Sequence, residues 1–130
     1  MTTPPGFATV TPYIFADDAP VLLTFLIEGL GGTEVGRSVD ETGRIANAQV
    51  RIGNCILMIS ESSEAWPAMP ASYYLYVDDA DVAVAQAVAA GATSIMAVAD
   101  MPYQDRQGGV RDPSGNIWWI SQRLQEGGYH

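Results

Sequence analysis

Apolar residues recur along the chain at two spacings, which predict alternating strands and helices. Residues 10–16 are rich in β-branched and aromatic side chains, a composition that favours a strand. Asp17 and Asp18 then offer an N-cap, and Pro20 suits the first turn of a helix. Gly31 and Gly32 are expected to end that helix. Its apolar face is formed by Leu22, Leu23, Leu26 and Leu30.

Shorter strand patterns follow this helix, and the whole arrangement occurs a second time. The first three are expected at 33–39, 44–52 and 55–61. The second unit is expected to contain a strand over 72–77, a helix over 82–90 and three strands, over 94–100, around 109–112 and over 116–122. Each unit is therefore predicted to have the order β-α-β-β-β.

The two units also resemble each other residue by residue, which indicates internal duplication. The segment Ile14-Phe15-Ala16-Asp17-Asp18-Ala19 matches Leu75-Tyr76-Val77-Asp78-Asp79-Ala80 at an offset of 61. Val50-Arg51 matches Val110-Arg111 at 60, and Ile59-Ser60 matches Ile120-Ser121 at 61. Similar segments in one order at nearly one offset favour two copies of a single structural unit.

Three motifs resemble the vicinal oxygen chelate superfamily, also called the glyoxalase/bleomycin resistance/dioxygenase family, and its PhnB-like branch in particular. They are 11–18, 48–54 and, most specifically, Asp112-Pro113-Ser114-Gly115-Asn116 before the apolar strand Ile117-Trp118-Trp119-Ile120. The resemblance implies an α+β fold in which two paired βαβββ modules form a curled mixed sheet, or cup, with helices on its outer face. It also implies a homodimer. The expected single domain, 1–130, divides into a module over 8–61, a linker over 62–71, a module over 72–122 and a flexible tail over 123–130.

Enzymes of that family hold a divalent metal with His, Gln or Glu side chains on the first and last strands of each module. The resemblance places those positions at Thr11, Met58, Ser72 and Trp119. None of them has a carboxylate or imidazole, the donors that hard and borderline divalent ions need. The only histidine is His130, the last residue. The sequence therefore predicts that the metal site is lost and that no cofactor is bound.

Side chains on a strand alternate between its two faces, so residues two positions from these four are expected to line the cup. Trp118 has the opposite parity and is expected in the core under the helices. The predicted lining is aromatic with a few polar groups, as a flat organic ligand requires. The candidate ligand-binding residues are Tyr13, Phe15, Gln49, Arg51, Met58, Trp66, Ser72, Tyr74, Tyr76 and Trp119.

Composition and charge narrow the choice of partners. The chain has 130 residues, 48% of them hydrophobic, and a net charge of −9. Its acidity disfavours nucleic acid and anionic membranes as partners. Cys55 is the only cysteine, which excludes an internal disulfide. Residues 1–8 lack the basic and apolar segments of a signal peptide, so a cytoplasmic location is expected.

These observations favour a non-catalytic protein that sequesters an aromatic, antibiotic-like molecule, in drug resistance or self-resistance. Three alternatives stay open. One is a metal-dependent lyase or dioxygenase with a non-standard site. The second is a metal-free enzyme that uses a tyrosine, Arg51 or Glu61 as an acid–base group. The third is a structural or regulatory dimer.

Overall fold

The computed structural model describes residues 2–128 and contains two successive βαβββ modules. The first module consists of β1 (Tyr13–Ala16), α1 (Ala19–Glu28), β2 (Thr33–Val39), β3 (Ile45–Ile52) and β4 (Cys55–Glu61). The second consists of β5 (Ser72–Tyr76), α2 (Ala80–Ala89), β6 (Thr93–Asp100), β7 (Asp105–Arg111) and β8 (Ile117–Arg123).

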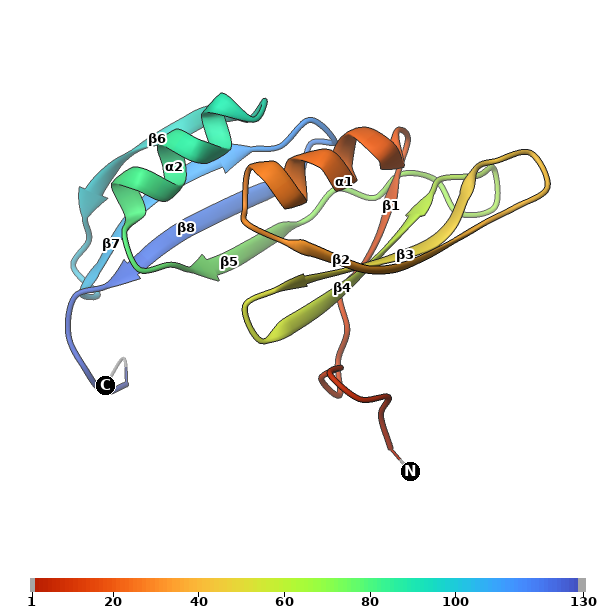
Figure 1. Cartoon of the computed structure of the whole chain (residues 1–130). Coiled ribbons are helices and arrows are strands. Elements are labelled where there is room, and N and C mark those ends of the chain that lie inside the picture. Colours follow the sequence, from red (N-terminus) through yellow and green to blue (C-terminus); the bar gives the residue numbers. More distant parts are fainter. Residues whose placement is uncertain (1, 129–130) are drawn as a thin grey trace.

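Each module forms its own four-stranded mixed sheet, with the orders β1-β4-β3-β2 and β5-β8-β7-β6. The first and last strands of each module run parallel, and the other pairs are antiparallel. Both helices lie on one side of the two sheets and leave the other side uncovered (Figure 1). We call this uncovered side the cup face. The predicted α+β fold is confirmed, and the sheets do not close into a barrel.

The first helix starts where the sequence predicts and ends earlier, whereas the second helix, Ala80–Ala89, starts two residues before the predicted range 82–90. The carboxylates of Asp18 and Asp79 accept hydrogen bonds from the amides of Val21 (3.3 Å) and Val82 (3.1 Å). Helix α1 ends at Glu28 with Gly29 as its C-cap, and the chain then turns at Gly31, whose φ is +74°. Leu30 was therefore wrongly included in the helix.

The largest error of the sequence analysis concerns β7, which was expected only around 109–112 and begins at Asp105. Its first half, Asp105-Arg106-Gln107-Gly108-Gly109, contains no apolar side chain and so lacks the usual pattern of a strand. This half is held in the sheet by its backbone pairing with β6 and β8. Arg106 also joins α2 through Asp81 (Nε to Oδ2, 2.7 Å), which anchors the helix over this strand.

The core lies between the helices and the sheets, and Trp118 is its anchor in the second module. Only 3% of Trp118 is exposed, as its predicted parity requires. Its indole Nε1 donates to the Asp112 carboxylate at 2.9 Å. The same carboxylate accepts from the amides of Ser114 and Asn116 and from the Asn116 side chain. The Asp-Pro-Ser-Gly-Asn motif is thus a turn organised around one buried carboxylate.

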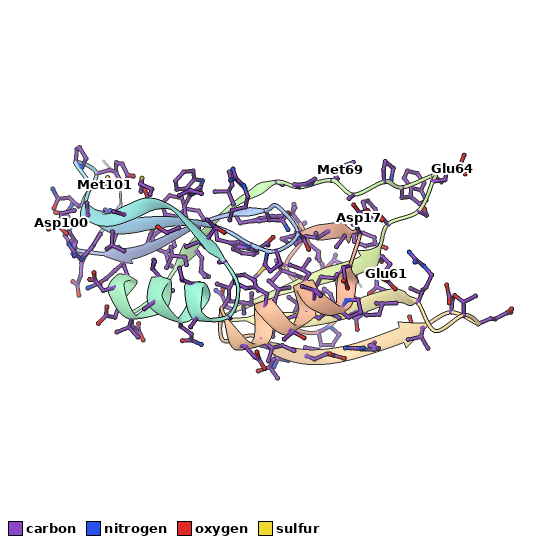
Figure 2. The ribbon with its side chains drawn as sticks, turned by 90° about the horizontal axis from the view of Figure 1, so that it is seen from above. Asp17, Glu61, Glu64, Met69, Asp100 and Met101 are labelled. Carbon is purple, nitrogen blue, oxygen red and sulfur yellow. The ribbon has the colours of Figure 1, made fainter. Side chains whose placement is uncertain are left out.

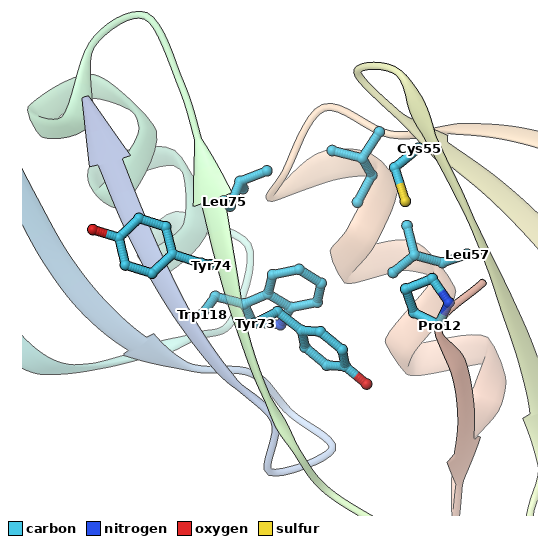
Figure 3. A pocket seen from close by; sticks show the side chains of 8 residues that line it. Pro12, Cys55, Leu57, Tyr73, Tyr74, Leu75 and Trp118 are labelled. Atoms are coloured by element: carbon cyan, nitrogen blue, oxygen red, sulfur yellow. The ribbon is translucent and has the colours of Figure 1, made fainter. Parts of the chain in front are cut away.

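An apolar seam joins the two modules, and a small, partly open pocket of about 120 Å³ lies along it. Tyr73 and Trp118 reach it from the second module, opposite Leu57 and Cys55 of the first (Figure 3). Burial raises the pKa of the Tyr73 hydroxyl, and the negative charge of Asp112 raises it further. Tyr74, the next residue along β5, has its ring on the other side of the strand (Figure 3).

The molecule is elongated, and the turns at its two ends are far apart. Asp100 and Met101, before β7, mark one end, and Glu64 in the connection between the modules lies at the other (Figure 2). Among the described residues, no helix is long and apolar enough to span a membrane.

Candidate functional site

The cup face of the second module carries an open hollow of about 390 Å³. Tyr74 of β5 and Trp119 of β8 are opposite one another in the parallel strand register, so their rings share this face. Among the described residues, the lining is aromatic and apolar apart from one amide, two phenolic hydroxyls and one indole N–H. It consists of Tyr74, Met96, Tyr103, Gln107 and Trp119.

Trp119 lies over a glycine, which makes room for its ring against the sheet. Gly109 is its partner on β7. A Cβ atom added to Gly109 would lie 2.8 Å from Trp119 Cζ3, closer than real Cβ atoms approach. The indole therefore covers the glycine backbone and remains half-buried at the edge of the hollow. Such an aromatic surface suits stacking with a flat ligand ring.

A chain of hydrogen bonds holds the polar groups of the hollow. Ser121 Oγ donates to the backbone carbonyl of Trp119 (3.3 Å), and Gln107 Nε2 donates to Ser121 Oγ (2.7 Å). Gln107 Oε1 accepts from the hydroxyl of Tyr103. Gln107 and Ser121 are buried, while the Tyr103 side chain at the rim is exposed. The network therefore fixes the direction in which the Tyr103 proton points.

A buried ion pair supports the opposite wall of the hollow. Asp105 is fully buried, accepts from the hydroxyl of Tyr74 and pairs with Arg123 (Oδ1 to Nη1, 2.9 Å). Arg123 also donates to the carbonyls of Tyr103 (2.8 Å) and Gly128 (2.9 Å). These contacts tie Tyr74, the turn before β7 and the segment after β8 into one unit.

The predicted residues of the first module form a separate aromatic group on its cup face. The rings of Tyr13 and Phe15 are 4.8 Å apart between centroids, and Phe15 stacks on Trp66 at 6.3 Å. The Tyr13 hydroxyl bonds to Ser60 Oγ at 2.7 Å. Met58 is beside Tyr13 in the strand register. The group is anchored through Ser60, which donates to the Ala46 carbonyl.

The other predicted residues lie apart from the hollow. Gln49 is beside Met58 and bonds to the side chain of Asn47. Arg51 is exposed on β3, and Ser72 is exposed at the start of β5. The ring of Tyr76 is 5.2 Å from that of Tyr74 and is 51% exposed. Only Tyr74 and Trp119 of the ten predicted residues line the hollow.

Sequence analysis missed Met96, Tyr103 and Gln107 in the hollow and the ion pair behind it. The internal repeat contained a signal for Gln107. At the offset of 60, Gln107 corresponds to Asn47, which is two residues before the predicted cup-face residue Gln49 and so shares its side of the strand. No comparable signal marked Tyr103, because it lies in a turn.

Comparison with known proteins gives a family. Residues 6–120 match the Glyoxalase/Bleomycin resistance protein/Dioxygenase superfamily. The chain belongs to this superfamily. An uncharacterized protein of Mycobacterium bovis is 27% identical over 128 residues, covering 90% of this chain and 84% of that protein. An uncharacterized protein of Mycobacterium tuberculosis is also 27% identical over 128 residues, and the match covers 90% of this chain and 75% of that protein. Membership in the PhnB-like branch stays a prediction.

Solved structures of the glyoxalase/bleomycin resistance type have the same fold. TioX from Micromonospora sp. ML1 aligns with a TM-score of 0.73 and 23% identity over 88% of this chain and 99% of its own. TnmS3, an antibiotic binding protein from Streptomyces sp. CB03234, aligns with a TM-score of 0.69 and 21% identity over 85% of this chain and 91% of its own. A glyoxalase-related enzyme from Fulvimarina pelagi aligns with a TM-score of 0.71 and 19% identity over 88% of this chain and 87% of its own. The fold is thus shared by a binding protein and an enzyme.

The residues at the superfamily's metal positions do not fit a metal in this chain. Met58 and Trp119 provide a thioether and an indole. Thr11 bonds to the Ala8 carbonyl, and Ser72 is exposed. Within residues 2–128, no three His, Cys, Asp or Glu side chains form a group suited to a metal ion. His130 is outside the described residues.

Proposed function

We propose that the protein binds an aromatic, antibiotic-like small molecule on the cup face and leaves it chemically unchanged. The observation that carries the proposal is the pairing of Trp119 and Tyr74 in an open, mostly apolar hollow, where the described part of the chain provides no set of metal ligands. A concave aromatic surface with a few fixed polar groups suits such a ligand. A role in drug resistance or self-resistance would follow from sequestration of the ligand.

Glu61 and two of the tyrosines considered for metal-free catalysis are engaged in structural hydrogen bonds, whereas Arg51 is exposed on β3. Glu61 Oε2 accepts a hydrogen bond from the amide of Ile45 at 2.9 Å, so this carboxylate supports the β3–β4 pair. The phenolic protons of Tyr74 and Tyr103 point to acceptors within the protein. The antibiotic-binding relative with the same fold, TnmS3, is consistent with a binding role. An enzyme with a metal-free site is the alternative.

The proposal is tested by native mass spectrometry of the purified protein against a panel of aromatic natural products. We expect at least one compound to bind at one equivalent per site and to be recovered with unchanged mass after prolonged incubation. We also expect elemental analysis to find no stoichiometric Zn, Ni, Fe or Mn, because Thr11, Met58, Ser72 and Trp119 are poor ligands. A converted product would favour the enzyme, and about one metal ion per chain would contradict the metal-free site.

We also propose a homodimer that covers the cup face. This face leaves large aromatic side chains in contact with solvent, with 65% of Trp66, 51% of Tyr76 and 46% of Tyr13 exposed. Large aromatic side chains exposed on one face are typical of an interface or a ligand site. A second copy of the chain would shield these rings and deepen the hollow.

The dimer predicts a specific effect of charge on the cup face. Light scattering should give twice the chain mass of 13.9 kDa. Tyr76→Glu should shift the protein toward the monomer, because it places a carboxylate in the interface. Val82→Glu is the matched control, since Val82 is 62% exposed on α2 and points away from this face. A monomer at all concentrations, or dissociation by both variants alike, would contradict the proposal.

A further inference from the structure

We propose that the hollow of the second module selects aromatic molecules that donate a hydrogen bond, and that the phenolic oxygen of Tyr103 is the acceptor. This inference rests on the proposed binding function and names the chemical class of its ligand. The ligand would lie on Trp119 and present an N–H or O–H group to Tyr103.

The first step of the argument is the direction of the hydrogen-bond chain. The carbonyl of Trp119 is an acceptor only, so Ser121 Oγ uses its one proton there. Ser121 then has only lone pairs left, and the amide nitrogen of Gln107 must face it. The carbonyl oxygen of Gln107 therefore faces Tyr103. The Tyr103 hydroxyl consequently donates to Gln107, and its oxygen offers lone pairs at the rim of the hollow.

The second step concerns the other polar groups of the hollow. The Tyr74 hydroxyl gives its proton to Asp105, whose carboxylate is fully buried behind it. Both phenolic protons of the lining thus point into the protein. Among the lining residues that the structure describes, a ligand with acceptors alone can meet the indole N–H of Trp119 but no phenolic proton, whereas a ligand with a donor can also bond to the Tyr103 oxygen.

The third step concerns charge. Within residues 2–128, the lining contains no cationic side chain. Arg123 bonds to the wall of the hollow, where its guanidinium pairs with Asp105 and donates to the carbonyls of Tyr103 and Gln104. The whole chain carries a net charge of −9. An anionic ligand would therefore lose hydration without gaining a counter-charge. Neutral or cationic rings are favoured, and a cation would also interact with the faces of the aromatic side chains.

Three probes with the same ring system separate these effects. Naphthol carries a donor, methoxynaphthalene lacks it, and naphthoate is an anion. Equilibrium dialysis should rank their affinities for the wild-type protein as naphthol, methoxynaphthalene and naphthoate. We expect about a fivefold gap between the first two, the scale of one neutral hydrogen bond, and a further gap on the order of tenfold to naphthoate.

Tyr103→Phe removes the acceptor and keeps the ring. It should weaken naphthol binding about fivefold and leave methoxynaphthalene unchanged. Tyr73→Phe is the matched control, because Tyr73 faces the seam on the other side of β5 and should leave both affinities unchanged. Because Tyr103 is 43% exposed, its substitution should leave the fold intact, which circular dichroism checks.

The outcomes distinguish this inference from the proposed function. Equal binding of naphthol and methoxynaphthalene, or tightest binding of naphthoate, would overturn the donor preference while the binding function stands. An equal loss for both neutral probes in Tyr103→Phe would overturn the role of its oxygen. No binding of any probe would reject aromatic binding in this hollow, and the inference with it.

Discussion

Replacement of Trp118 by alanine should lower the free energy of unfolding by about 3–5 kcal/mol, the range for truncating a large buried aromatic residue. Trp118 is 3% exposed and its ring centroid is 4.8 Å from that of Tyr73 at the seam between the modules. The substitution would leave a cavity there and remove one donor from the Asp112 carboxylate. Urea unfolding at a fixed protein concentration measures the change.

Trp118→Phe separates packing from hydrogen bonding in this prediction. Phenylalanine keeps an aromatic ring in the core and lacks the indole N–H that Asp112 accepts. Asp112 would still accept from Ser114 and Asn116, so the loss should be smaller, about 1–2 kcal/mol. If Trp118→Ala were destabilised by less than about 1 kcal/mol, the assignment of Trp118 to the core would be wrong.

The contrast between strongly patterned and weakly patterned segments explains what the sequence could predict. Helix α1 contains apolar residues at regular spacing, and the burial of Leu22, Leu23 and Leu26 follows directly from that spacing. The first half of β7 is polar because Asp105 and Gln107 bond to side chains on β5, β8 and the preceding turn. Such partners are distant in sequence, so the spacing of apolar residues cannot predict them.

The same distinction applies to the candidate site. Alternation along β5 and β8 correctly separated the cup-face residues Tyr74 and Trp119 from Trp118 in the core. Alternation also placed Ile56 on the cup face, but Ile56 is only 2% exposed, and Gly6 of the N-terminal segment lies next to it. Parity along a strand therefore assigns a side to each residue, whereas tertiary contacts decide which residues remain open to a ligand.

Replacement of Trp119 by alanine should weaken binding of an aromatic ligand by about 1–3 kcal/mol, or roughly 5-fold to 150-fold, with a smaller loss of stability than at Trp118. The reason is that Trp119 is half-buried at the hollow and presents its ring there, whereas Trp118 faces the helices. Fluorescence or calorimetric titration with a panel compound that binds measures the affinity, and urea unfolding measures the stability of the same variant.

Gly109→Ala tests the same arrangement while Trp119 itself is kept. Its added methyl group would come within 2.8 Å of Trp119 Cζ3 and so displace the ring from the sheet. Ligand affinity should fall in this variant. Gly108→Ala is its matched control, since the added methyl group would meet Val84 and Val98 on the helix side, so stability should fall while affinity is retained by the folded protein. If Trp118 rather than Trp119 controls affinity, or if Gly108→Ala and Gly109→Ala weaken binding equally, ligands do not bind on the cup face of the second module.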